Sequence, residues 1–308
     1  MNTTGKIITF AGGLAAVFAL ALGVGAAVGP EPATEPGPHD THDSGPAPVA
    51  SGPGGLLTTD QGYTLRLDSA LATATTPSTL SFQILDASGA PLTRYTRSHD
   101  KDLHLILVRR DLAAFQHVHP TLDATGTWSV PVDLSRAGDY RVFADFTPDG
   151  GPNLTLRTDL RVSGNYDPQP LAAPASTATI GDYTVTLDGA IVPGQASRVR
   201  LSVERGRAPV TDLQPYLGAY GHLVALRATD LAYLHVHPEG QPGDGSTPAG
   251  PGIDFVVEAP TAGDYRLFLD FQHAGVVRTA QFTVSVGADP ATPAPTTSTQ
   301  PEQPGHGH

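Results

Sequence analysis

The chain of 308 residues repeats itself at the scale of a whole domain. The run AGDYRVFADF begins at Ala137, and the run AGDYRLFLDF begins 125 residues later at Ala262. The motif His-Val-His-Pro also occurs twice, ending at Pro120 and again 118 residues later at Pro238. The seven extra residues of the second copy fall in 240–252, which has the glycine and proline content of a loop. This duplication predicts two tandem copies of one fold, each of about 110 residues.

Each copy has the hydrophobic pattern of an all-β domain. Apolar and polar residues alternate in 63–67, 80–84 and 128–132 of the first copy and in 253–257 of the second. This period of two is typical of antiparallel strands with one buried face. The pattern predicts about seven short strands per copy and no helix after the N-terminal segment. Seven strands in about 110 residues favour two tandem immunoglobulin-like β-sandwiches over barrels.

The repeated Gly-Asp-Tyr sequence supports the same fold. Tyr140 and Tyr265 each come directly before an apolar run in the two copies. In immunoglobulin-like sandwiches a tyrosine at this place donates a hydrogen bond to the backbone upstream and fixes the corner between two strands. We therefore interpret both tyrosines as structural residues.

The two ends of the chain differ in composition from the copies between them. Residues 7–29 form an uncharged apolar run of 23 residues after Lys6, long enough to cross a bilayer as a helix. Because positive charges beside a membrane span tend to stay in the cytoplasm, Lys6 is expected on that side and the residues after 30 on the other. We interpret the run as a single-pass anchor in the cell membrane, with a cleaved signal and secretion as the alternative. The predicted organisation is anchor or signal 1–29, disordered Pro/Gly-rich tether 30–54, sandwiches 55–164 and 175–287, and disordered tail 288–308.

Charge and cysteine content exclude several classes of function. The net charge of −12 repels nucleic acid. The absence of cysteine from the sequence excludes disulfides, thiolate metal sites and catalytic thiols. The sequence has no glycine-rich phosphate loop and no nucleophile motif with a base, so we do not expect an enzyme. A hydrolase with an open zinc site is a weaker alternative.

The remaining chemistry is concentrated in histidine. Six of the twelve histidines lie in two copies of one pattern, a histidine followed thirteen residues later by His-Val-His-Pro. In the first copy His104 and His117 lie on two short strands with a short link, which predicts an antiparallel hairpin. With the turn centred near Arg110 and Asp111, His104 faces His117 directly and His119 lies diagonally on the same face. Such a face suits a divalent ion about 2.0–2.1 Å from each nitrogen.

The second copy predicts a matching site from its own three histidines. Asp145 and Asp270 occupy equivalent places in the two copies, and each is a candidate ligand or an acceptor that fixes an imidazole tautomer. The alternative is that the histidines only close the hairpins and hydrogen-bond to loop carbonyls. His99 and His273 have no counterpart in the other copy and are interpreted as surface residues. The predicted metal ligands are His104, His117, His119, His222, His235, His237, Asp145 and Asp270.

The ligand type limits which metal is expected. Neutral imidazole suits Cu(II), Zn(II) and Ni(II), and the affinity order of divalent ions favours Cu(II) over Zn(II). Met1 is the single methionine of the sequence, so a Cu(I) site of soft ligands is not expected. Binding requires deprotonated imidazole, so affinity should fall as the pH drops through about 6.5.

The apolar N-terminal run is followed by the same three short motifs in each copy. In the first copy these are HLILV from His104, DL from Asp111 and HVHP from His117, and their counterparts are GHLVALR, DL and YLHVHP. In these features the chain resembles exported actinobacterial proteins described as heavy-metal-binding or copper-tolerance proteins, and its layout is similar to YtkA-like immunoglobulin-type domains. The resemblance covers residues 1–30 and 55–287. It implies metal handling at the membrane, with a metal-transport protein or copper chaperone as a partner.

These observations together predict an extracytoplasmic, membrane-anchored protein that binds divalent metal and serves copper or zinc buffering, delivery or tolerance. The other function that the sequence allows is a non-enzymatic cell-surface interaction module in which the histidines are structural. A metal ion and the membrane are the expected partners, and nucleic acid is not.

Overall fold

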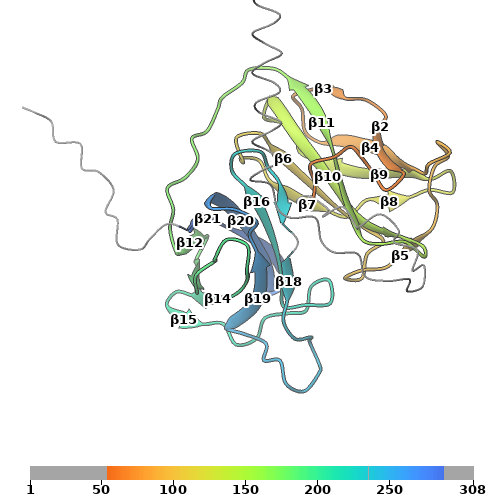
Figure 1. Cartoon of the computed structure of the whole chain (residues 1–308). Coiled ribbons are helices and arrows are strands. Elements are labelled where there is room, and N and C mark those ends of the chain that lie inside the picture. Colours follow the sequence, from red (N-terminus) through yellow and green to blue (C-terminus); the bar gives the residue numbers. More distant parts are fainter. Residues whose placement is uncertain (1–53, 235, 288–308) are drawn as a thin grey trace, which may run out of the picture. The chain divides into compact units, whose positions relative to one another are not determined.

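The computed structural model describes residues 54–234 and 236–287, with His237 described by its backbone alone. Every regular element in these residues is a β-strand, as the alternation predicted (Figure 1). The first repeat contains β1 (Thr59–Asp60), β2 (Tyr63–Leu67), β3 (Leu71–Thr73), β4 (Ser78–Leu85), β5 (Tyr95–Thr96), β6 (Leu103–Arg109), β7 (Gln116–Val118), β8 (Thr121–Leu122), β9 (Thr127–Val132), β10 (Gly138–Pro148) and β11 (Leu154–Ser163). The second contains β12 (Thr177–Ile180), β13 (Tyr183–Asp188), β14 (Ala196–Arg205), β15 (Ala208–Pro209), β16 (Gly221–Arg227), β17 (Tyr233–Leu234), β18 (Val236–Pro238), β19 (Gly252–Glu258), β20 (Gly263–His273) and β21 (Val276–Val286).

The strands of each repeat form two sheets with the connectivity of an immunoglobulin-like sandwich. In the first repeat one sheet has the order β1-β2-β4-β9-β8, and the other has the order β3-β11-β10-β6-β7. In the second repeat the corresponding orders are β12-β13-β14-β19-β18 and β17-β16-β20-β21. This arrangement confirms the two tandem β-sandwiches of the predicted fold, and the predicted N-terminal helix lies outside the described residues. Among the described residues the first repeat has eleven strands and the second has ten, where about seven per repeat were expected, because several of the strands are only two or three residues long.

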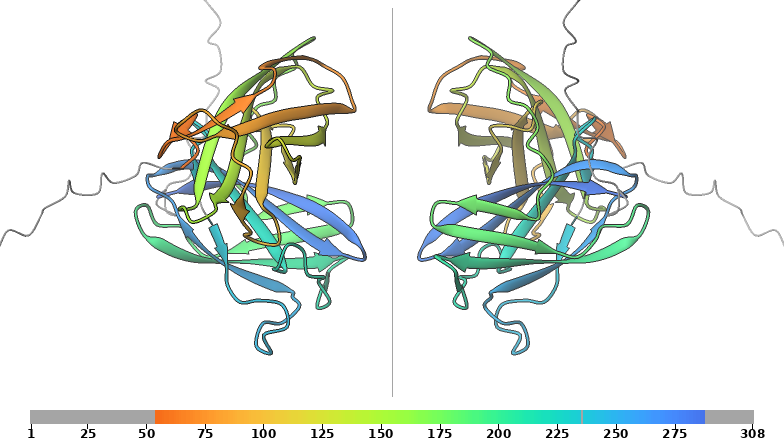
Figure 2. Two further views of the ribbon diagram at one scale, coloured as in Figure 1. Left: turned by 90° about the vertical axis from the view of Figure 1, so that its right-hand side faces the viewer. Right: turned by 90° about the vertical axis from the view of Figure 1, so that its left-hand side faces the viewer.

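Figure 2 shows the backbone of the two sheets in each repeat. The side chains on their inner faces form a separate core in each repeat. In the first repeat the ring of Phe82 on β4 stacks with that of Trp128 on β9, with centroids 6.4 Å apart. In the second repeat Phe255 on β19 and Leu201 on β14 are fully buried. Removing such side chains from water stabilises each sandwich by roughly 25 cal/mol per Å² of apolar surface.

The two predicted corner tyrosines have the expected hydrogen bonds. The Tyr140 hydroxyl donates to the carbonyl of Arg136 at 2.6 Å, and the Tyr265 hydroxyl donates to the carbonyl of Thr261 at 2.9 Å. Both tyrosines are buried. The structure therefore confirms a tyrosine corner in each repeat.

Strands β6 and β16 are buried on both faces, which differs from the half-buried strands that alternation predicts. Leu105 and Leu107 of β6 point into the core of the first repeat. Ile106 and Val108 belong to a different apolar cluster, which contains residues of both repeats. The continuous apolar run from residue 105 to 108 is the sequence signature of such double burial.

The shared cluster is built from equivalent residues of the two repeats. The ring of Phe115 stacks on Phe268 with centroids 3.8 Å apart, and the ring of Phe143 lies 5.8 Å from that of Tyr233. These contacts are reciprocal, since Phe115 corresponds to Tyr233 and Phe143 to Phe268 in the duplicated sequence. The buried members of the cluster are Ile106, Val108, Leu112 and Phe143 of the first repeat and Val224, Leu226, Leu231, Tyr233 and Phe268 of the second.

The segments predicted at the two ends lie outside the described residues. These are the anchor or signal at 1–29, nearly all of the tether that follows it, and the tail from residue 288. Within residues 54–234 and 236–287, no helix is long and apolar enough to cross a membrane.

Candidate metal centre

The first histidine pattern lies on the hairpin of β6 and β7, which closes through a compact loop. The Arg109 amide donates to the carbonyl of Ala113 at 2.9 Å, and the Leu112 amide donates to the carbonyl of Arg109 at 2.7 Å. Leu112 and Ala114 have positive φ angles of 64° and 53°. For residues with a Cβ this conformation costs roughly 1–3 kcal/mol, which burial of the Leu112 side chain in the shared cluster offsets. The second repeat builds a related turn that is one residue longer, in which the Leu231 amide donates to the carbonyl of Arg227 at 2.8 Å and Leu231 has a φ of 59°.

This loop sets a register that differs from the predicted one. His117 pairs with Ile106 across the hairpin, and not with His104 as the sequence suggested. The prediction was wrong because it centred the turn too early, before Leu112 takes up its left-handed conformation. The displacement is two residues, and a shift of two keeps every side chain on its predicted face.

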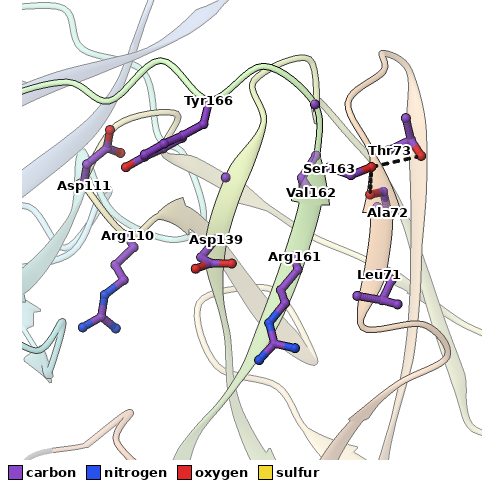
Figure 3. Close-up of a pocket in the computed structure, with 12 residues that line it drawn as sticks. Leu71, Ala72, Thr73, Arg110, Asp111, Asp139, Arg161, Val162, Ser163 and Tyr166 are labelled. Atoms are coloured by element: carbon purple, nitrogen blue, oxygen red, sulfur yellow. Dashed lines mark hydrogen bonds between the residues drawn. The ribbon is translucent and has the colours of Figure 1, made fainter.

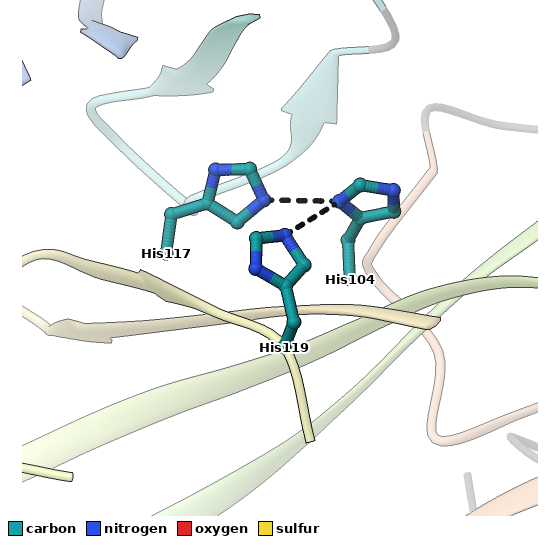
Figure 4. A group of neighbouring side chains, drawn as sticks. All are labelled: His104, His117 and His119. Carbon is teal, nitrogen blue, oxygen red and sulfur yellow. Dashed lines mark hydrogen bonds between the residues drawn. The ribbon is translucent and has the colours of Figure 1, made fainter. Parts of the chain in front are cut away.

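Three ring nitrogens of the first repeat converge on one point (Figure 4). His104 Nδ1 lies 3.1 Å from His117 Nε2 and 3.1 Å from His119 Nε2. The three histidines can each offer one nitrogen such that all three atoms lie within 4.8 Å of one another. We refer to His104, His117 and His119 as the histidine triad.

Two histidines of the triad are oriented by bonds at their other ring nitrogen. His104 Nε2 lies 3.1 Å from the carbonyl of Ser98, and His117 Nδ1 lies 2.7 Å from a carboxylate oxygen of Asp270. A carbonyl and a carboxylate accept hydrogen bonds, so both of these nitrogens carry the proton. The facing nitrogens, His104 Nδ1 and His117 Nε2, then hold lone pairs. Two such acceptors 3.1 Å apart repel each other unless a cation lies between them.

The spacing of the nitrogens fits a transition-metal ion. With metal–nitrogen distances of about 2.0–2.1 Å, two nitrogens 3.1 Å apart subtend an angle of about 100° at the metal. A tetrahedral site requires about 109°, so a small movement of the rings completes the geometry. Three protein ligands leave one tetrahedral position open.

Burial favours the neutral form of two triad histidines, His104 and His119. Removal from water, followed by repulsion from the neighbouring His117, lowers the pKa of His104 to about 3. Burial is also the main reason that the pKa of His119 falls to about 2, followed by repulsion from His117 and His104. Neutral imidazole is the form that binds metal. The predicted competition with protons near pH 6.5 therefore does not apply to His104 and His119 in the folded protein.

The second repeat contributes two buried polar residues to the surroundings of the triad. His222 on β16 and Asp270 on β20 are paired across their strands, and both are buried. The His222 ring lies 6.2 Å from that of His104 and 6.4 Å from that of His117, centroid to centroid. Its Nε2 donates to the carbonyls of Tyr216 and Leu217, at 3.0 Å each. Burial lowers the pKa of His222 to about 4.

The second histidine pattern does not repeat the arrangement of the first in the residues that the structure describes. The pairing of β16 with β17 ends at Leu234, and β18 pairs with β19 in the other sheet of the sandwich. The backbone of His237 therefore lies opposite Val256, in the sheet that does not contain His222. In the first repeat the chain changes sheets later, at β8. His235 lies outside the described residues.

The remaining sequence candidates have different surroundings. Asp145 pairs with His104 across β10 and β6, and its carboxylate accepts a hydrogen bond from Asn153 at 2.9 Å. The interpretation of His273 as a surface residue is wrong, because it is buried and its Nδ1 lies 2.7 Å from the Tyr183 hydroxyl. His99 is half-buried, and its ring lies 5.1 Å from that of His222. The surroundings of His99 and His273 could not be predicted from the duplication, because neither histidine has a counterpart in the other copy.

A pocket of about 750 Å³ lies apart from the triad, along β3 and β11 (Figure 3). Its wall includes Tyr166, whose ring packs against the guanidinium of Arg109 at 5.2 Å. Arg109 is buried and forms two hydrogen bonds with Asp111, at 2.9 and 2.6 Å. Asp111 also accepts from the amide of Gln169 at 2.8 Å. This pair ties the hairpin loop to the segment that follows the first repeat.

One family model matches both repeats. It is described as Domain of unknown function (DUF8832), and it matches residues 58–164 and 178–288. The chain belongs to this family. The duplication seen in the sequence is therefore two DUF8832 domains in tandem. None of the curated proteins matches the chain.

Solved structures of bacterial adhesins share a distant likeness with the tandem DUF8832 domains. The Escherichia coli adhesin FdeC is 12% identical, with 73% of this chain and 64% of that chain covered and a TM-score of 0.23. The Yersinia pseudotuberculosis adhesin InvE is 14% identical, with 72% and 58% covered and a TM-score of 0.22. Invasin, titled a bacterial integrin-binding protein, is 15% identical, with 74% and 40% covered and a TM-score of 0.22. The chain thus spans less than two thirds of these proteins, and the fold assignment rests on the strand order described above.

Proposed function

We propose that this protein binds one divalent transition-metal ion through His104, His117 and His119. The observation that carries the proposal is the convergence of three ring nitrogens, two of which are held as lone-pair donors by Ser98 and Asp270. A cation between them removes the repulsion that the metal-free arrangement contains. The carboxylate behind His117 is also the usual partner of a metal-bound histidine.

The donor set suits Cu(II) and Zn(II) best among divalent ions. All three donors are neutral imidazole nitrogens, and the sequence offers no thiolate and a single thioether, at Met1. The affinity order of divalent ions favours Cu(II), whereas an angle of about 100° is close to the tetrahedral preference of Zn(II). We propose that Cu(II) binds more tightly than Zn(II). The open coordination position of the bound ion would permit its exchange with a donor or acceptor protein.

The proposed role is metal buffering or delivery outside the cytoplasm, without catalysis. The uncharged run at 7–29, with Lys6 before it, supports an anchor that leaves both repeats on the extracytoplasmic side. The resemblance to exported heavy-metal-binding proteins supports the same role, with a metal-transport protein or chaperone as the partner.

Isothermal titration of the purified protein with Cu(II) and with Zn(II) tests the proposal. We expect one ion per chain at the tight site and a loss of affinity of more than about 100-fold for His104→Ala, because loss of an outer hydrogen-bond partner alone costs about 10–100-fold. The control is the double variant His306→Ala and His308→Ala, which removes two histidines of the C-terminal tail. It should keep the tight site.

Equal affinities in the wild type and in His104→Ala would show that the triad does not hold the ion. In that case the histidines are structural, and the alternative of a cell-surface interaction module is favoured.

A further inference from the structure

The environment of the triad is divided between the two repeats. The triad itself comes from β6 and from β7 with the residue just beyond it, in the first repeat, whereas the carboxylate that orients His117 comes from β20 in the second. The His117 and Asp270 side chains are 5% and 4% exposed, so their contact is sealed from water. The second oxygen of Asp270 accepts a hydrogen bond from the Thr279 hydroxyl at 2.5 Å, which holds the carboxylate in place.

The same faces of the same strands continue into the apolar cluster that joins the repeats. On β6, His104 is followed on its face by Ile106 and Val108, and on β20 Asp270 is preceded on its face by Phe268. Residues that differ by two lie on one face of a strand. The triad and the apolar cluster are therefore two ends of one contact surface between the repeats.

We propose that the metal ion acts as a latch that locks the two DUF8832 domains together. This inference rests on the proposed function. The triad binds metal most tightly when His117 Nδ1 donates to Asp270, and that bond exists only when the repeats are docked. Metal binding and docking are then linked, and the linkage is reciprocal: metal strengthens docking to the same degree that docking strengthens metal binding.

The latch gives Asp270 a positioning role and not a ligand role. Its negative charge keeps the proton on His117 Nδ1 and makes Nε2 a better donor to metal. Loss of such an outer partner weakens metal binding by about 10–100-fold in metalloproteins. This effect is expected although Asp270 belongs to the repeat that does not carry the triad.

The test compares Asp270→Asn with Asp264→Asn in the full protein. Asp264 lies on the same strand and accepts a hydrogen bond from Ser285 on β21, as Asp270 does from Thr279, but it is bonded to no histidine in the described residues. Titration with Zn(II) should show a loss of about 10–100-fold for Asp270→Asn and wild-type affinity for Asp264→Asn. If Asp270→Asn does not fold, Thr279→Val provides a milder variant, for which we expect a smaller loss in the same direction.

Hydrogen exchange measures the docking of the repeats separately from the affinity for metal. With saturating Zn(II), amides of β16 and β20 in the second repeat should exchange more slowly in the wild type, although neither strand carries a triad residue. Asp270→Asn saturated with Zn(II) should lack that protection.

Three results would overturn the latch. Wild-type affinity in Asp270→Asn, or protection by Zn(II) confined to the first repeat, would refute the coupling while His104→Ala still loses the site and the proposed function stands. Absence of tight Zn(II) and Cu(II) binding by the wild-type protein would remove both the latch and the proposed function.

Discussion

In His104 and His117 of the triad, one ring nitrogen forms a hydrogen bond within the protein and the other faces the centre of the triad. His104 Nε2 donates a hydrogen bond to the carbonyl of Ser98, and His117 Nδ1 donates one to the carboxylate of Asp270. These bonds fix ring orientation before any ion arrives, which reduces the entropy that binding must overcome. Burial lowers the pKa of both His104 and His119, so these two imidazoles are neutral in the metal-free protein.

This neutrality makes the metal-free protein sensitive to acid. In the folded state burial lowers the pKa of His104 to about 3 and that of His119 to about 2, whereas both titrate near 6.5 in the unfolded chain. The unfolded chain therefore binds more protons below pH 6.5. The free energy of unfolding should be constant above about pH 6.5 and should fall as the pH drops toward about 3.

Urea unfolding at several pH values, with a chelator present, measures this dependence. Each buried histidine adds about 1.4 kcal/mol per pH unit to the slope once the unfolded form is protonated. His119→Gln should reduce the slope by about one such step. An unchanged slope in that variant would mean that His119 is protonated in the folded protein.

At the scale of the secondary-structure element, the hairpin of β6 and β7 is held in place by the ion pair at its turn. Arg109 is 1% exposed and also donates to the carbonyls of Ala137 and Asp167, at 3.0 and 2.8 Å. Asp111 supplies the charge that compensates this buried cation. The pair therefore fixes the loop that determines where His117 lies.

Removal of Asp111 should be much more harmful than removal of its counterpart. Asp111→Ala leaves the Arg109 guanidinium buried without its counter-charge, which costs about 3–5 kcal/mol. Asp230→Ala disrupts the equivalent pair with Arg227, whose side chains are 39% and 16% exposed, so we expect a smaller loss. Urea unfolding followed by far-UV circular dichroism reports on both repeats, and fluorescence reports on the first, since Trp128 is the single tryptophan of the sequence. Equal stabilities of the two variants would contradict this view of the turn.

The face of each histidine could be predicted from the sequence, whereas its register and its outer partners could not. Period two places His117 and His119 on one face whatever the turn does. Register depends on the left-handed conformation of Leu112, which a leucine rarely adopts and no local signal announces. The bond from His117 to Asp270 joins residues 153 positions apart in different repeats, so only the docking of the repeats reveals it.

At the scale of the whole molecule, duplication explains how two sandwiches came to share a face. The contacts are reciprocal, since Phe115 packs on Phe268 and its counterpart Tyr233 packs on Phe143, the counterpart of Phe268. A contact between equivalent surfaces is self-complementary, as in a symmetric dimer. The fusion of two copies in one chain allows one side to differ, and the change of sheets after Leu234 is such a difference.

A charge in the shared cluster should separate the unfolding of the two repeats. Leu226 is fully buried, but within its own repeat it lies on the outer face of β16, so Leu226→Asp disrupts docking and not the core of the second sandwich. Wild-type urea transitions followed by Trp128 fluorescence and by far-UV circular dichroism should coincide, and those of Leu226→Asp should not. Val276→Asp, at a residue 51% exposed on β21, is the control and should keep a single transition. Coincident transitions in Leu226→Asp would mean that the repeats remain docked without the cluster, and metal affinity should then also be unchanged in that variant.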